Sequence, residues 1–160
     1  MRAVMYLFLN RGLGMSTGKS AAQAGHAAVE AALISNSNMT YEKAALWDAW
    51  REGGHYTKLV MEARDEQHLE NIERYLIDRR FNTALIIDEG HTEVAPLTIT
   101  ALGVAVVDKD DPHTKATFSS FKLYRDDPPE PPMVSLAEVG YHDPKVVDIR
   151  EARRRRMRRR

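Results

Sequence analysis

The sequence contains no cysteine among its 160 residues. Disulfide bonds, thiolate metal sites and thiol nucleophiles are therefore excluded. Long apolar runs are missing as well: the one near the start, Ala3 to Leu9, stops at Asn10. A run of that length is too short for a membrane span, or for a signal-peptide core with its cleavage site. We therefore expect a protein that does not contact membranes and is located in the cytoplasm.

Charge of one sign is concentrated at one end of the chain. The whole sequence has 23 basic and 23 acidic residues. Residues 150–160 contain eight arginines and one glutamate, so this segment carries +7 and the remainder −7. A basic tail on an acidic body is typical of binding to a polyanion. Two other interpretations stay open: the tail folds back onto the acidic body, or it only increases solubility.

Hydrophobic patterning predicts one α/β domain. Apolar runs typical of buried strands alternate with segments of helical periodicity, and the last strands follow one another without a helix. We expect a three-layer α/β/α fold with a mixed sheet of about four or five strands and helices on both faces. The expected strands cover residues 4–9, 58–63, 84–87, 98–107 and, at an edge, 118–124; helices cover 18–33, the segment after Thr40 up to Gly53, and the segment after Asp65.

Composition changes after residue 124. The segment 126–132 contains four prolines, which is typical of a stiff extended linker. Asp143 and Pro144 are able to start a helix that carries the arginines. We therefore divide the chain into a core at 1–124, a proline-rich linker at 125–143 and an arginine-rich tail at 144–160.

The tripeptide Gly18-Lys19-Ser20 suggests a phosphate-binding loop, but its spacing is wrong. Such a loop needs a glycine five positions before the Gly-Lys pair, and Leu13 stands there. The run Ile86 to Glu89 resembles the magnesium-binding strand of the same enzymes, yet both motifs are short. A nucleotide hydrolase is therefore a minor alternative. The six histidines show no paired metal spacing, so we expect neither a metal nor another cofactor.

Three stretches together resemble one known family. Residues 15–28 (MSTGKSAAQAGHAA), 88–96 (DEGHTEVAP) and 100–104 (TALGV) are similar to the first loop and helix, the acidic loop and the following strand of type 2 peptidyl-tRNA hydrolases, the archaeal and eukaryotic class. Weaker similarity lies at Lys58 and at 122–124. The resemblance covers roughly residues 3–124 in the right order, which makes it more specific than any single motif.

The resemblance implies hydrolysis of the ester between a peptide and its tRNA, with Lys19, Asp88 and Thr100 as catalytic residues. An ammonium at a helix start can stabilise an oxyanion, and a carboxylate that ends a buried strand can position or deprotonate water. If the first strand, which leads to Lys19, and the strand that ends at Asp88 are parallel neighbours, then Lys19, Asp88 and Thr100 meet at one rim of the sheet. The expected substrate-binding residues are Gly18, Gln23, His26, Lys58, His91 and Thr92.

The sequence departs from the family at four positions. An aspartate is usual at Gly12, an arginine at His91, a glutamine at Glu93 and a glycine at Leu97. Because two of these changes remove positive charge or add negative charge near the expected RNA path, the tail is the candidate for compensation. The tail residues expected to bind RNA are Arg153, Arg154, Arg155, Arg156, Arg158, Arg159 and Arg160. A non-catalytic RNA-binding module and a homodimer both stay open.

Overall fold

The computed structural model describes residues 1–37 and 40–125. The predicted tail, and the linker beyond Arg125, lie outside the described residues. The elements are β1 (Ala3–Asn10), the 3-10 turn η1 (Arg11–Leu13), α1 (Thr17–Asn36), α2 (Tyr41–Asp48), the π-helical turn η2 (Ala49–Gly53), β2 (Lys58–Ala63), α3 (Glu66–Asp78), β3 (Thr83–Asp88), β4 (Thr98–Val104), β5 (Val107–Asp108) and α4 (Pro112–Phe118).

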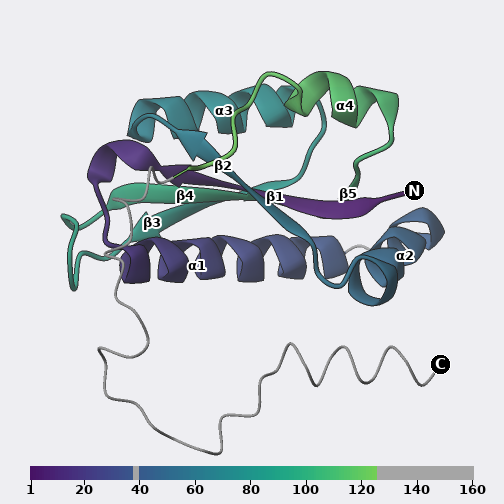
Figure 1. Cartoon of the computed structure of the whole chain (residues 1–160), viewed down its shortest axis with the longest axis horizontal. Helices are drawn as coiled ribbons and strands as arrows, with labels where there is room; N and C mark the ends of the chain where they lie inside the picture. Colours follow the sequence, from purple (N-terminus) through teal and green to yellow (C-terminus); the bar gives the residue numbers. More distant parts are fainter. Residues whose placement is uncertain (38–39, 126–160) are drawn as a thin grey trace, which may run out of the picture. The chain divides into compact units, whose positions relative to one another are not determined.

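The strands form a mixed five-stranded sheet in the order β2-β1-β4-β3, with β5 paired to β1. Strand β1 runs parallel to β2 and antiparallel to β4, and β3 is also antiparallel to β4. Helices α1 and α2 cover one face, and α3 and α4 cover the other (Figure 1). The predicted fold class is confirmed. Strands β1 and β3 are parallel but not neighbours, because β4 lies between them; their carboxyl ends still share one rim.

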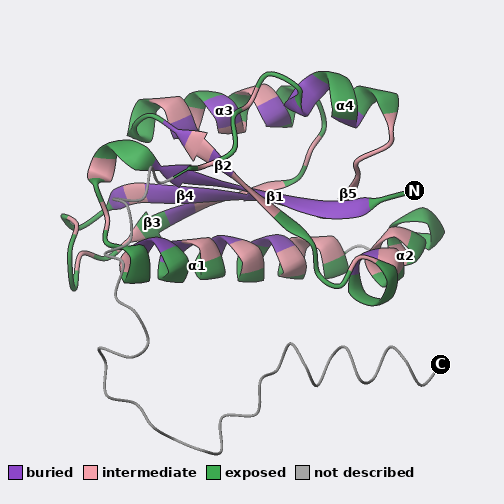
Figure 2. Ribbon diagram, in the orientation of Figure 1, coloured by how far each residue is buried: buried purple, intermediate pink, exposed green. Residues whose placement is uncertain are grey.

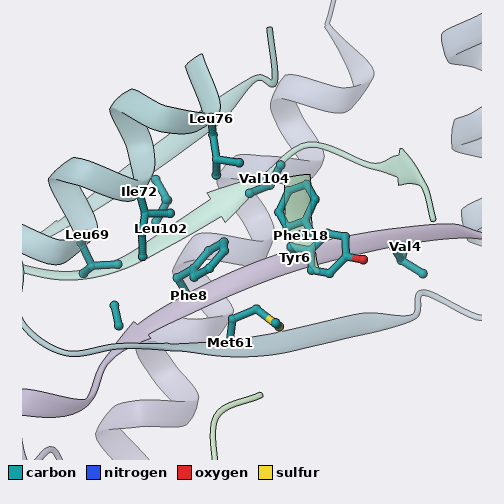
Figure 3. Close-up of a cluster of buried hydrophobic side chains, with 11 residues drawn as sticks. Val4, Tyr6, Phe8, Met61, Leu69, Ile72, Leu76, Leu102, Val104 and Phe118 are labelled. Atoms are coloured by element: carbon teal, nitrogen blue, oxygen red, sulfur yellow. The ribbon is translucent and has the colours of Figure 1, made fainter. Parts of the chain in front are cut away.

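Strand β1 is the centre of the core and is buried along its whole length (Figure 2). Its alternate residues Val4, Tyr6 and Phe8 pack with the apolar face of α3 and with Phe118 (Figure 3). The residues between them belong to the second cluster, on the side of α1. This two-sided burial agrees with the continuous apolar run predicted for a covered strand.

Small residues let α1 approach the sheet closely. Ala27 and Ala31 of this helix are fully buried. A Cβ added to Gly103 of β4 would lie 2.3 Å from the carbonyl oxygen of Ala27. The helix backbone therefore lies directly on β4, and side chains near the start of α1 reach the rim where β3 ends and β4 begins.

Side-chain caps fix where the helices begin, as the sequence predicts. The Ser16 hydroxyl accepts a hydrogen bond from the Lys19 N–H at the start of α1. Thr40 and Asp65 cap α2 and α3 in the same manner. Within residues 1–37 and 40–125, no helix is both long and apolar enough to cross a bilayer.

The predicted edge strand at 118–124 is wrong for its first residues and holds only at its end. Asp111 caps a helix instead, accepting from the Thr114 N–H at 2.8 Å, and Pro112 occupies its first turn. Helix α4 then runs to Phe118, whose ring packs on Tyr6. The chain reaches the sheet edge only at residues 122–124: Leu123 forms an antiparallel bridge with Met61, the Glu62 N–H donates to the Lys122 carbonyl, and the Tyr124 N–H donates to the Val60 carbonyl. The Asp-Pro pair is a helix-start signal that outweighs the apolar residues after it.

The predicted strand at 98–107 is also interrupted. Strand β4 ends at Val104 because the next backbone donors leave the ladder: the Ala105 N–H donates to the Asn82 carbonyl and the Val106 N–H donates to the Ser35 hydroxyl. The chain then rejoins the sheet as β5, which pairs antiparallel with Ala3 and Val4 at the start of β1.

Candidate active site

A β-bulge turns Thr100 toward α1. Ile86 pairs with Ala101 and Ile87 pairs with Ile99, so Thr100 is the extra residue of β4. Ile99 packs with the α3 cluster, whereas Ala101 belongs to the α1 cluster. Because of the bulge, Thr100 and Ala101 are adjacent in sequence and both face α1, which strict alternation would forbid.

Lys19 and Asp88 form an ion pair at the rim where α1 begins and β3 ends. The Lys19 Nζ lies 2.6 Å from the Asp88 Oδ2, and both side chains are 11% exposed. The same ammonium donates to the Thr92 hydroxyl at 2.9 Å. The Lys19 ammonium therefore links α1 to Asp88 and Thr92. A small part of the ion pair remains exposed to solvent.

Gln23 connects this ion pair to the buried Thr100. Its Nε2 donates to the Asp88 Oδ2 at 2.8 Å, and its Oε1 accepts a hydrogen bond from the Thr100 hydroxyl. Gln23 is 1% exposed and Thr100 is fully buried. Lys19, Asp88 and Thr100 thus belong to one hydrogen-bonded cluster, but Thr100 reaches it only through Gln23.

The Asp88 carboxylate is held on both oxygens. Its Oδ1 accepts from the Gly90 N–H at 2.8 Å, while Oδ2 accepts from Lys19 and Gln23. The Lys19 ammonium, followed by the Gly90 N–H, holds the pKa of Asp88 below its usual range. Asp88 is therefore an anion at neutral pH, with weak affinity for a proton.

The loop at 89–97 depends on two left-handed residues. Gly90 has φ +79°, and a Cβ there would lie 2.4 Å from the Pro96 nitrogen. Leu97 has φ +64° and is exposed, and its N–H donates to the Asp88 carbonyl at 2.8 Å. Glycine is the residue best suited to such a conformation. The departure from the family's glycine at Leu97 therefore places a strained backbone directly beside Asp88.

Glu93 occupies the start of α1. Its carboxylate accepts from the Ser16 N–H at 2.8 Å and from the Ser16 hydroxyl at 2.5 Å. These bonds lower the pKa of Glu93. In a phosphate-binding loop the helix start would receive a phosphate, whereas here a carboxylate of the protein takes that position. This arrangement counts against the nucleotide-hydrolase alternative. The sequence marked Glu93 as a departure from the family, without indicating this contact.

The departure at Gly12 has a steric reason. A Cβ on Gly12 would lie 2.3 Å from the Arg64 carbonyl oxygen, so the backbone of η1 packs against the end of β2. The family's usual aspartate would require this turn to move.

The remaining predicted binding residues divide into two locations. Gly18 lies in the first turn of α1, and His26 is exposed on that helix. His91 is exposed in the loop after β3 and pairs with Glu89 at 3.0 Å. Lys58 instead starts β2 at the opposite rim, where its Nζ lies over the rings of Trp50 and Tyr56. The structure does not bring Lys58 to the cluster.

A groove of about 840 Å³ opens from the ion pair. Its walls are one face of α1 and strand β3, and its rim is the loop after β3. His26, His91, Thr92 and Glu93 line it together with Lys19, Gln23 and Asp88. A volume of this size suits a small organic group. Within residues 1–37 and 40–125, no cluster of three or more histidine or acidic side chains is arranged to hold a metal ion.

Comparison with known proteins gives a consistent result. The family model described as "Peptidyl-tRNA hydrolase PTH2" matches residues 3–124. A peptidyl-tRNA hydrolase of Pyrobaculum aerophilum is 38% identical over 126 residues, which cover 78% of this chain and all of that protein. Enzymes of the same name from Thermococcus onnurineus and Methanocaldococcus jannaschii are 36% and 33% identical, over 68% and 71% of this chain and 92% and 93% of their own. The chain belongs to the peptidyl-tRNA hydrolase PTH2 family.

Proposed function

We propose that this protein hydrolyses the ester between peptide and tRNA in peptidyl-tRNA, with Lys19 and Asp88 as the residues that meet the reacting groups. The observation that carries the proposal is the largely buried Lys19–Asp88 ion pair, which lines a groove, in a chain of the PTH2 family. Water attacks the ester carbonyl and the bond to the ribose oxygen breaks. One proton of the water goes to the ribose oxygen, which becomes a free tRNA hydroxyl, and the other is released to solvent as the peptide leaves as a carboxylate.

Lys19 is placed to stabilise the negative charge that develops on the ester oxygen. An ammonium has three N–H donors. Within the described part of the chain, two of them reach Asp88 and Thr92. The third N–H remains for a substrate oxygen. The position at the start of α1 adds the positive end of the helix dipole, which favours the same anion.

Asp88 is suited to orienting groups rather than to removing a proton. An efficient general base has a pKa near the operating pH, whereas the pKa of Asp88 is lowered by Lys19. A carboxylate offers about four acceptor positions, and three are used by Lys19, Gln23 and Gly90. The fourth is available to hold the attacking water, while the others keep the ammonium in place.

Gln23 and Thr100 act as positioning residues in this proposal. Both are buried beneath the ion pair, so neither contacts the ester directly. The Thr100 hydroxyl fixes which way the Gln23 amide points, because the amide oxygen accepts from it. The Gln23 N–H then meets the correct oxygen of Asp88. A preorganised carboxylate needs no rearrangement during the reaction.

His26, His91 and Thr92 line the groove, and Gly18 lies beside Lys19 in the first turn of α1; these four residues are the proposed contacts for the substrate. The core at 1–124 carries the chemistry, and the arginines at 153–160 attract the phosphates of tRNA. We place the reaction in the cytoplasm, where translation produces peptidyl-tRNA. Lys58, at the opposite rim, has no role at the ester in this arrangement.

The direct test uses purified protein and a peptidyl-tRNA with a blocked amino terminus. We expect stoichiometric release of free tRNA and free peptide, separated by acid gel electrophoresis, at a rate that added ATP does not change. Binding of tRNA without release would instead indicate the RNA-binding module. A requirement for ATP would revive the nucleotide-hydrolase alternative.

A further inference from the structure

The groove extends well beyond the ion pair, along two elements. On α1 it follows the face that carries Lys19, Gln23 and His26, and it reaches Val29 and Glu30. On β3 it runs from Asp88 back to Ala84. Eleven helical residues at about 1.5 Å each span roughly 16 Å, and four strand steps at about 3.3 Å each span roughly 13 Å. The reacting groups therefore lie at one end of an elongated trough.

Strand β3 offers a backbone edge to this trough. Within the described residues, β3 pairs only with β4, so it is the last strand of the sheet on this side. About half of the N–H and C=O groups of such a strand point away from its neighbour. Unpaired edges of this kind accept an extended peptide as an added strand.

Exposed apolar side chains lie beside that edge. Val29 of α1 and Ile87 of β3 are 59% and 54% exposed, although both are aliphatic. Both also line the groove. A partner that covers them would remove apolar surface from water, which is favourable.

We infer that the last residues of the substrate's peptide add to the free edge of β3 as a parallel strand, with the ester at Lys19 and Asp88. This inference rests on the proposed function, which places the ester at that end. The peptide's carboxyl end then lies at the carboxyl end of β3, so the two chains run in the same direction. A trough of about 13 Å holds roughly four extended residues.

Backbone pairing also suits the nature of this substrate. Main-chain hydrogen bonds provide affinity whatever the side chains are. The peptide of a peptidyl-tRNA varies in sequence, and an enzyme that reads its backbone accepts all of them. The groove therefore selects for an extended peptide chain next to the ester rather than for particular residues.

The first experiment varies the substrate and leaves the protein unchanged. N-acetylated alanine peptides of one to six residues are esterified to one tRNA, and kcat/KM is measured for each. We expect a rise on the order of tenfold or more up to about four residues, followed by a plateau. N-methylation of the second and third residues from the ester removes their donors and should abolish most of this gain, relative to the unmethylated peptide of equal length.

The second experiment uses a matched pair of variants. Val29→Trp adds bulk inside the groove, and Leu33→Trp adds the same bulk one turn further along α1, at a side chain that is 60% exposed and outside the groove. Val29→Trp should remove the length-dependent gain and leave the one-residue substrate nearly unaffected. Leu33→Trp should change neither, and both circular dichroism spectra should match the wild type.

The outcomes separate the inference from the function that underlies it. Hydrolysis at rates independent of peptide length, or equal behaviour of the two variants, would overturn the groove assignment and leave the ester hydrolysis standing. A dimer that Val29→Trp dissociates, with rates independent of length, would assign the edge to a second copy instead. Absence of hydrolysis at every length would refute the proposed function, and the inference with it.

Discussion

Replacing Thr100 with valine tests whether a fully buried hydroxyl controls a reaction that it does not touch. The substitution keeps the shape of the side chain and removes only the donor to the Gln23 Oε1. Gln23 is 1% exposed, so water cannot easily replace the lost partner. An unsatisfied buried acceptor costs about 1–3 kcal/mol.

The expected loss of stability is measurable by thermal unfolding. At this chain length each kcal/mol changes the melting temperature by roughly 2–4 °C, so Thr100→Val should melt roughly 2–12 °C lower. Thr100→Ser retains the hydroxyl and loses one methyl group, which costs about 1 kcal/mol. Both variants are therefore expected to lose some stability, but only Thr100→Val loses the hydrogen bond to Gln23.

Kinetics separate positioning from mere stability. With its amide unanchored, Gln23 no longer fixes Asp88, and a misplacement of about 1 Å can reduce turnover by up to about 10²-fold. We expect Thr100→Val to lower kcat roughly 10–100-fold with little change in KM, and Thr100→Ser to remain within about threefold of the wild type. A valine variant with normal kcat, or a serine variant as slow as valine, would refute the positioning role.

Three further predictions concern the loop after β3 and the tail. Because the folded-state pKa of Glu93 is lowered, its contribution to stability is present above the unfolded value near 4.5 and is lost as the pH falls through the folded value. Glu93→Gln should therefore melt below the wild type at pH 6–7, and the difference should shrink in thermal scans as the pH falls below about 4.5. Leu97→Gly should raise the free energy of unfolding by about 0.5–1 kcal/mol in urea titrations, since relief of a left-handed backbone outweighs the added flexibility of the unfolded chain. Deletion of residues 150–160 should weaken tRNA binding and flatten its salt dependence by about 0.7–0.9 per lost phosphate contact, with turnover at saturating substrate unchanged.

Each of these has a contradicting result. An equal difference between Glu93→Gln and wild type at every pH would mean that the charge on Glu93 contributes nothing through Ser16. A Leu97→Gly variant less stable than wild type would show that the leucine packs usefully. Identical salt dependence with and without the tail would favour the interpretations in which it neutralises the acidic body or aids solubility.

The parts of the fold that sequence predicted are those fixed by local signals. The caps at Ser16 and Asp65 set where α1 and α3 begin. The continuous apolar run of β1 reflects its burial on both faces of the sheet. The expected edge strand failed at its first residues because Asp111 and Pro112 start a helix that continues to Phe118. Apolar residues alone do not distinguish a strand from a short helix that packs on the core.

The site depends on non-local features that no short pattern encodes. Thr100 faces Gln23 only because of a bulge, and the bulge is a property of how β3 and β4 register. A spacing of four residues puts Lys19 and Gln23 on one face of α1, but it does not predict that both donate to the same oxygen, Asp88 Oδ2. Lys58 came from resemblance alone, and its position at the opposite rim follows from the direction of β2.

The most direct test of the account compares three variants in single-turnover cleavage of one peptidyl-tRNA. Lys19→Ala removes the cation, Asp88→Asn removes the charge that holds it, and Asp110→Asn removes a carboxylate that is paired with Arg2 away from the site. We expect the first two to lower the rate of tRNA release roughly 10²–10⁴-fold with normal folding, and Asp110→Asn to match the wild type. Near-normal release by Lys19→Ala or Asp88→Asn would contradict the claim that this ion pair meets the ester.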